Sequence, residues 1–158
     1  MNTSQVVLLA VSLFFLPSVA LAGDVASLED AFENVIERLN AHDQEGFMKV
    51  WHPEAILIVY DYLFPVDRSD TGDEVWAQIF KDFFTTARIT LTPIDVDFRV
   101  VEGTGMVWGL TQTMLESPDG ESEVKKLRVS ATFVEVDRAW KLLNWHSSLP
   151  PERSRQSD

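Results

Sequence analysis

Hydrophobic positions repeat with helical spacing near the start of the chain. Ser27, followed by Glu29 and Asp30, is typical of a helix N-cap with acid in the first turn, and the predicted helix ends near residues 40–42. Its apolar stripe consists of Leu28, Phe32, Val35, Ile36 and Leu39. Asp43 predicts the cap of a second, shorter helix that runs through Trp51 and ends at Pro53.

The next two segments predict one strand and one helix. Ala55 to Tyr60 is an apolar run without a polar break, which is typical of a strand covered on both faces. After a polar loop over residues 64–70, Thr71-Gly72-Asp73-Glu74 resembles a capping box that opens a third helix. The apolar positions of that helix are Val75, Trp76, Ile79, Phe80, Phe83 and Phe84.

From Arg88 onward the hydrophobic period changes to two, which predicts strands. Four stretches follow one another: Arg88 to Val101, Met106 to Glu116, Val124 to Val136 and Trp140 to Ser147. Short Gly, Asp and Pro connections join them, as between antiparallel neighbours. We therefore predict an α+β fold, with three N-terminal helices packed in a curved, mostly antiparallel sheet whose concave interior could hold a ligand.

The first residues predict export. An apolar run from Val6 ends in Ala20-Leu21-Ala22, which is typical of a secretory signal peptide over residues 1–22. An uncleaved anchor is the alternative, although Pro17 interrupts the run. We expect one domain over residues 23–150, a disordered tail over 151–158, a periplasmic or secreted location, and no stable membrane insertion after cleavage.

Composition narrows the range of partners. The net charge of −12 argues against nucleic-acid binding and against binding to anionic membrane surfaces. The chain has no cysteine, so no disulfide or cysteine-ligated metal can hold the fold together. No two of the three histidines, His42, His52 and His146, are spaced as metal ligands on one helix, and no glycine-rich phosphate loop is present. We expect neither a metal nor a cofactor.

Several short motifs follow one another in a characteristic order: residues 39–43 with Phe47 and Trp51, 53–56, Gly72, 128–133 and 140–148. In that order they resemble SnoaL-like domains of the nuclear transport factor 2-like superfamily, which have a cystatin-like cone fold. The resemblance covers residues 27–150, and its closing Trp-Lys-x-x-x-x-His-Ser pattern is also similar to the association domain of calcium/calmodulin-dependent kinases. It implies a cone around a pocket, and it leaves the activity open because this superfamily contains isomerases, cyclases, dehydratases, oligomerisation modules and adaptors.

Ketosteroid isomerase, an enzyme of this superfamily, needs a phenol and two carboxyl groups in its pocket. The resemblance places Val35 where the phenol would be and Val59 where the first carboxylate would be, with Asp61 two residues later. Residues 125–128, Lys-Lys-Leu-Arg, stand where the second acid is expected. An isomerase reaction of that kind is therefore not expected.

The last strand supplies the first candidate site. Regular alternation places Trp140, Leu142, Asn144 and His146 on one face, and the resemblance places that face toward the interior. His146 would then lie at the pocket mouth beside Arg128 and Thr132, where it could move a proton while Arg128 orients an anion. A structural histidine is the simpler interpretation.

A second candidate follows the first strand, where Asp61 stands between Tyr60 and Tyr62 and could act as a general base. A strand end in solvent explains the same residues. Aromatic side chains, among them Trp51 and Trp108, could line an apolar pocket for a ring-shaped ligand, although most would simply form core.

Leu143 and Trp145 would lie on the opposite, exposed face of the last strand, which suggests a homodimer. Three functions stay open. The first is binding of a small, largely apolar ligand without a defined reaction. The second is a SnoaL-type isomerase, cyclase or dehydratase reaction that uses His146 and Asp61. The third is a structural or oligomerisation role.

Overall fold

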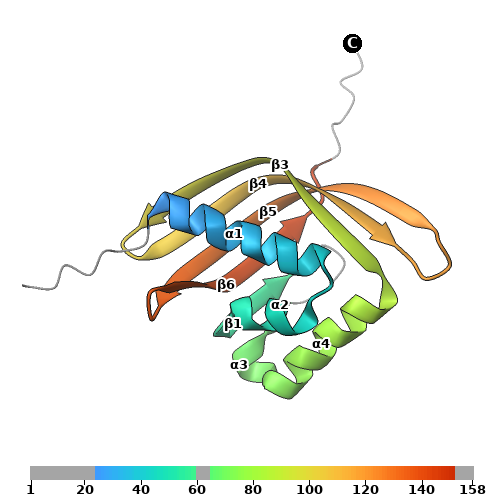
Figure 1. The fold of residues 1–158 in the computed structure, drawn as a ribbon, viewed down its shortest axis with the longest axis horizontal. Coiled ribbons are helices and arrows are strands. Elements are labelled where there is room, and N and C mark those ends of the chain that lie inside the picture. Colours follow the sequence, from blue (N-terminus) through green and yellow to red (C-terminus); the bar gives the residue numbers. More distant parts are fainter. Residues whose placement is uncertain (1–23, 60–64, 152–158) are drawn as a thin grey trace, which may run out of the picture.

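The computed structural model describes residues 24–59 and 65–151. Its elements follow the predicted order, with one additional two-residue strand and one additional short helix (Figure 1). In chain order they are α1 (Val25–Asn40), α2 (Gln44–Val50), β1 (Trp51–Ile58), β2 (Val66–Asp67), α3 (Arg68–Thr71), α4 (Asp73–Thr86), β3 (Arg88–Val101), β4 (Thr104–Glu116), β5 (Ser122–Val136) and β6 (Ala139–Ser148). The predicted signal peptide, the predicted tail except for Pro151, and residues 60–64 lie outside the described residues.

The helix ends differ in part from the predictions. Asp24, not Ser27, caps α1, and its carboxylate accepts from the backbone N–H of Ser27. Asp43 caps α2 as predicted, by accepting from the backbone N–H of Gly46. The predicted capping box of α4 is absent: Gly72 is the N-cap residue without a side-chain bond, and the Thr71 hydroxyl donates to the carbonyl of Asp67 instead.

The end of α2 also corrects the prediction that Trp51 is helical. The helix ends at Val50, and Trp51 and Pro53 both belong to β1. Trp51 already has an extended backbone, with φ −82° and ψ 142°. The residue directly before a proline, here His52, is biased toward extended conformations, which favours a strand rather than a helix on the approach to Pro53.

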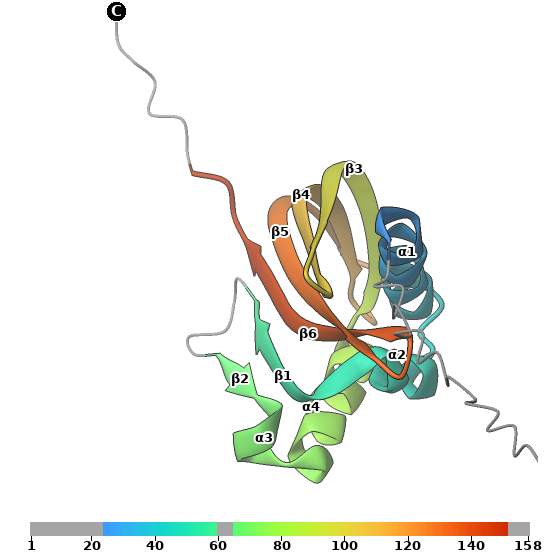
Figure 2. The ribbon, with the colours of Figure 1, turned by 90° about the vertical axis from the view of Figure 1, so that its left-hand side faces the viewer.

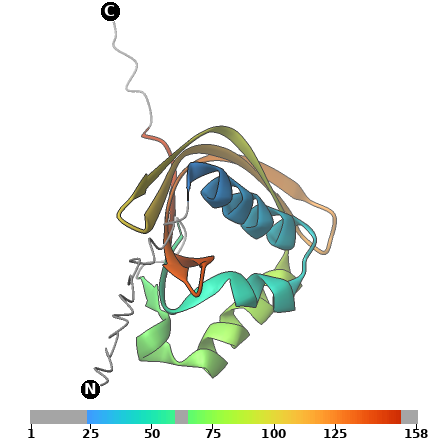
Figure 3. The same ribbon diagram turned by 60° about the vertical axis from the view of Figure 1, so that its left-hand side comes forward.

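Six strands form one sheet in the order β2-β1-β6-β5-β4-β3. Only β1 and β6 pair in parallel; the other neighbours are antiparallel. The sheet curves around α1, while α2 and α4 close one end of its concave side (Figures 2 and 3). The predicted α+β fold, with helices packed in a curved, mostly antiparallel sheet, is confirmed.

Irregular positions in the strands accompany this curvature. The β3–β4 register shifts between Pro93 and Asp95, and the β5–β6 register shifts opposite Thr132 and Phe133, which leaves Leu143 as an extra residue in β6. Gly109 of β4 lies where a Cβ atom would come within 2.1 Å of the carbonyl oxygen of Asp95. Bulges and close backbone approaches of this kind bend a sheet and change which residues face its interior.

The turn between α1 and α2 holds β3, which is an edge strand of the sheet. The Asn40 side chain donates to the carbonyl of Leu91 and accepts from the backbone N–H of the same residue, at 3.0 and 2.8 Å. His42 Nε2 accepts from the N–H of Ile89. These bonds satisfy backbone groups that an edge strand would otherwise leave unpaired.

Among the described residues, no helix is long and apolar enough to cross a membrane.

Candidate functional site

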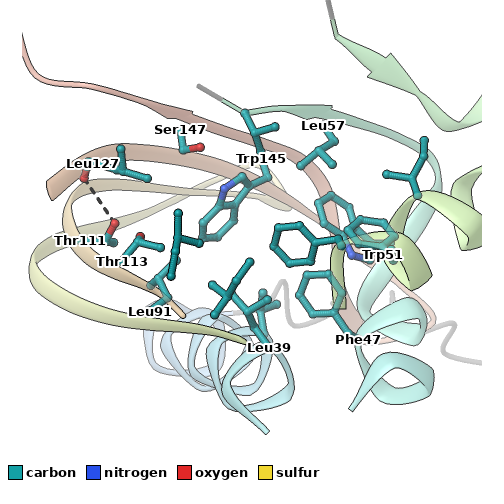
Figure 4. A pocket seen from close by; sticks show the side chains of 17 residues that line it. Leu39, Phe47, Trp51, Leu57, Leu91, Thr111, Thr113, Leu127, Trp145 and Ser147 are labelled. Carbon is teal, nitrogen blue, oxygen red and sulfur yellow. Dashed lines mark hydrogen bonds between the residues drawn. The ribbon is translucent and has the colours of Figure 1, made fainter. Parts of the chain in front are cut away.

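A cavity of about 130 Å³ lies between the concave face of the sheet and helices α1, α2 and α4 (Figure 4). Strands β1, β3, β4, β5 and β6 all contribute to its wall. The lining residues are Val35, Leu39, Phe47, Trp51, Leu57, Val59, Ile79, Phe80, Phe83, Ile89, Leu91, Thr111, Thr113, Leu115, Leu127, Trp145 and Ser147. The interior of the cone is therefore not completely filled by its own side chains.

The described lining of the cavity is uncharged. It contains no Asp, Glu, Lys, Arg or His, and apolar or aromatic side chains form most of it. Val35 and Val59, which stand where the resemblance would place the isomerase's phenol and first carboxylate, both belong to this lining. An environment of this kind disfavours a bound ion, because burying an unpaired charge costs far more than burying an apolar group.

Three hydroxyl groups break the apolar wall. Thr111 and Thr113 come from β4 and Ser147 from β6, and these three are the buried polar residues of the described chain. The Thr111 hydroxyl donates to the carbonyl of Leu127 at 3.3 Å. The Thr113 hydroxyl is buried and has no hydrogen-bond partner among the described residues. We call Thr111, Thr113 and Ser147 the hydroxyl end of the cavity.

Aromatic side chains form the opposite end, which we define by Phe47, Trp51 and Phe80 and call the aromatic end. Each pair of these rings has its centroids 5.2–5.8 Å apart. In Figure 4, Phe47 and Trp51 lie on one side of the cavity and the hydroxyl end on the other, with Trp145 between them. The cavity thus has two chemically different ends.

The structure corrects the predicted orientation of His146. Trp140 packs against the core, and Leu142 is fully buried, so the predicted interior face is right up to this point. Leu143 is the extra residue of the bulge, and beyond it the alternation is reversed. Trp145 and Ser147 line the cavity, whereas Asn144 and His146 pair with Thr132 and Ser130 on the convex face.

The other nominated residues of β4 and β5 share that convex face. Arg128 is exposed and donates to the Ser148 hydroxyl and the Leu149 carbonyl. Trp108 is 37% exposed, with the Arg99 guanidinium 5.6 Å from its ring. Asn144 donates to the carbonyl of Ile56 and thereby joins β6 to β1.

Of the nominated residues that the structure describes, Trp51 is the one placed in the cavity wall. The predicted positions of His146, Arg128, Thr132, Trp108 and Asn144 in the pocket are wrong, because inward and outward residues alternate along each strand and the bulge reverses that order in β6. Tyr60 and Asp61 lie outside the described residues.

The sequence-based argument for a dimer also changes. It rested on Leu143 and Trp145 lying on the outer face of β6, yet Trp145 is buried at 8% exposure and lines the cavity. The convex side of β6 instead carries Asn144 and His146 beyond the bulge. That strand therefore presents a polar outer surface where an apolar one was expected.

The hydroxyl end was missed by sequence reasoning. A usable signal was present in β4, where Gly105, Val107, Gly109, Thr111 and Thr113 alternate with larger outward residues. Threonine at consecutive inward positions of a central strand is unusual in a purely apolar core. No comparable signal predicts Ser147, because its inward orientation depends on the bulge at Leu143.

Solved structures with NTF2-like (nuclear transport factor 2-like) and cystatin-like folds share this architecture. A candidate dehydratase of the NTF2-like family from Streptomyces avermitilis superposes with a TM-score of 0.71 at 15% identity, over 81% of this chain and 97% of that chain. A candidate calcium/calmodulin-dependent protein kinase II association domain from Xanthomonas campestris gives 0.70 at 17% identity, over 82% and 90%. An uncharacterised protein with a cystatin-like fold from Caulobacter vibrioides gives 0.66 at 13% identity, over 80% and 89%.

At these identities the structural likeness shows the fold and not the activity. No curated protein matches the chain in sequence. The family of SnoaL-like domains matches residues 28–152, which is most of the chain and includes every element from the first turns of α1 to the end of β6. The chain therefore belongs to the SnoaL-like domain family.

Proposed function

We propose that this protein binds a small, uncharged, largely apolar molecule of about the size of a single ring in the cavity of its cone. The observation that carries the proposal is an unfilled cavity whose described lining has no charged side chain. Apolar cavities in proteins are costly to keep empty, and a lining of this type gains free energy when an apolar molecule displaces weakly held water or void.

The volume of the cavity limits the size of the ligand. An engineered cavity of about 150 Å³ with an apolar lining holds one benzene molecule, and the cavity here measures about 130 Å³. A steroid or a fused polycyclic molecule does not fit without movement of the walls, whereas a six-membered ring with one small substituent does.

A reaction in this cavity would need a proton donor or acceptor near the ligand. The described lining supplies hydroxyl and indole groups but no titratable acid or base, and His146 lies on the convex face. The catalytic alternative therefore depends on residues outside the described ranges, such as Asp61, and we place binding ahead of catalysis.

Export and self-association remain predictions. The signal-like segment and the absence of cysteine support a periplasmic or secreted location. Native mass spectrometry of the exported protein would give the mass of the mature chain, the number of subunits and any co-purifying molecule together.

Titration with toluene tests the binding proposal. Ligand-observed NMR, or the change in tryptophan fluorescence to which Trp51 and Trp145 contribute, measures the binding. We expect saturable binding to one site per chain. The matched variants are Leu57→Phe, which narrows the cavity, and Ile58→Phe, which makes a similar change at the next position of β1, outside the lining. Leu57→Phe should weaken toluene binding at least about tenfold, and Ile58→Phe should leave it unchanged.

Circular dichroism and the unfolding midpoint establish that each variant is folded. If Leu57→Phe fails to fold, Leu115→Phe replaces it, because Leu115 also lines the cavity but is only half-buried. Absence of toluene binding to the wild-type chain, or equal binding by the inner and outer variants, would contradict the proposal.

A further inference from the structure

The hydroxyl end makes the cavity chemically asymmetric. All three buried polar residues of the described chain lie in its wall, and they lie together at one end of it. Polar groups are rarely placed in a protein interior without a partner, because leaving one unpaired costs free energy on desolvation. Their concentration at one end of one cavity therefore needs an explanation.

Among these three residues, Thr113 is the one whose burial most needs an explanation. Thr113 is 6% exposed, and its hydroxyl has no hydrogen-bond partner among the described residues, while the neighbouring hydroxyl of Thr111 is bonded to the carbonyl of Leu127. Because a hydroxyl both donates and accepts, Thr113 can pair with a hydroxyl or with a carbonyl oxygen. Valine would fill the same volume without an unpaired group, so packing does not require threonine here.

Indole N–H groups complement the hydroxyls. Trp145 lies between the two ends, and Figure 4 shows its indole nitrogen on the side of the ring nearer the hydroxyl end. Trp51 Nε1 is buried without a hydrogen-bond partner among the described residues, in a side chain that lines the aromatic end. Indole nitrogen only donates, so the Trp145 nitrogen favours a ligand with an accepting oxygen at the hydroxyl end. Trp51 Nε1 lies at the aromatic end, away from that oxygen.

Trp76 Nε1 is also buried without a hydrogen-bond partner in this part of the chain, but Trp76 does not line the cavity. Its ring meets that of Trp51 edge to face, with centroids 5.3 Å apart and planes at 80°. An N–H group can point at an aromatic face in such a contact. Of the three buried side-chain atoms without a partner in the described chain, those of Thr113 and Trp51 therefore belong to residues of the cavity lining.

We propose that the ligand of this cavity is a neutral single-ring compound with one oxygen substituent, a phenol, cyclic alcohol or cyclic ketone, whose oxygen hydrogen-bonds to Thr113 while its ring packs against the aromatic end. This inference rests on the proposed function, and it adds the polarity and the orientation of the ligand. A carboxylate is excluded as the substituent, because no cationic side chain occurs in the described lining to pair with it.

The experiment compares phenol with toluene, which are nearly equal in shape and differ in a hydroxyl against a methyl group. The measured quantity is the ratio of their dissociation constants, in the wild-type chain and in Thr113→Val. Thr132→Val is the matched control: it makes the same change on the convex face of the neighbouring strand. Benzoate serves as the charged probe of similar size.

We expect Thr113→Val to shift the phenol-to-toluene ratio against phenol by about five- to tenfold, the usual size of one hydrogen bond. Thr132→Val should leave the ratio unchanged, and benzoate should bind at least about a hundredfold more weakly than phenol. An unchanged ratio in Thr113→Val, or benzoate binding equal to that of phenol, would overturn the assignment of the oxygen. If toluene still binds in that case, the proposed function stands and only the assignment of the oxygen fails. If neither toluene nor phenol binds to the wild-type chain, both the proposed function and this inference are refuted.

Discussion

The concave and convex faces of the same sheet carry similar residue types in very different environments. Thr113 and Trp145 face the cavity and are buried, whereas Thr132 and Trp108, on neighbouring strands, face outward. On the concave face, helices exclude solvent, so we expect a single hydroxyl group to affect stability and, at the proposed site, ligand choice. On the convex face of the single chain, water can satisfy the same group. Residue type alone thus says little about function in a curved sheet until the side that it faces is known.

The largest expected contrast is between a core tryptophan of α4, on the concave side of the sheet, and a tryptophan on the convex face. Trp76 is fully buried, while Trp108 is 37% exposed and contacts Arg99. We expect Trp76→Ala to lower the free energy of unfolding by about 3–5 kcal/mol, through lost contacts and the remaining cavity. Trp108→Ala should cost about 1 kcal/mol or less. Urea denaturation measures both, and similar losses would mean that the convex face is covered in solution by a second surface.

The two inward threonines of β4 should respond in opposite directions. Thr111→Val removes a bonded hydroxyl, and we expect it to lower the free energy of unfolding by about 1 kcal/mol. Thr113→Val removes an unpaired one, so the ligand-free protein should become more stable by about 1 kcal/mol. Thermal unfolding without ligand measures the pair. A destabilised Thr113→Val would mean that water or another group already satisfies this hydroxyl.

Low pH should affect stability through the helix caps and not through the uncharged cavity, and this is the smallest of the expected effects. The backbone N–H of Gly46, with a further contribution from Arg38, lowers the pKa of Asp43 below its ordinary value. A carboxyl with a lowered folded-state pKa stabilises the fold above its unfolded pKa of about 3.9, and this contribution disappears as the pH falls through the folded-state pKa. Asp43→Ala should therefore be less stable than the wild-type chain at pH 7, and the difference should shrink below pH 4.

Measurements of unfolding midpoints from pH 7 to pH 2.5 test this dependence. Toluene binding by Asp43→Ala at pH 7 is the accompanying control, and it should equal that of the wild-type chain because Asp43 is outside the cavity lining. A stability difference that stays constant across this range would exclude the carboxylate as the source of the effect.

The sequence by itself determined the order of the elements and the family. The change of period at Arg88 and the Asp43 cap indicated the main helices and strands, because helical and strand patterns depend on local spacing. The short elements β2 and α3 were not predicted, and the family was indicated by short motifs in their order. The bounds predicted for the last four strands differ from the observed ones by no more than two residues at either end. Trp51, which was nominated for the pocket from a predicted helix, lies in β1 and in the cavity wall, and its role in ligand binding stays a prediction.

Only the tertiary structure decided which side chains face the cavity. Regular alternation would have taken His146 inward, and one extra residue, Leu143, sends it outward and brings Trp145 and Ser147 inside. A bulge depends on how β6 pairs with β5, and such pairing between strands is not encoded in the spacing of one strand. The unpaired hydroxyl of Thr113 likewise follows from contacts that five strands and three helices make together. Thus local periodicity fixed the elements, whereas the strand register fixed the chemistry of the cavity.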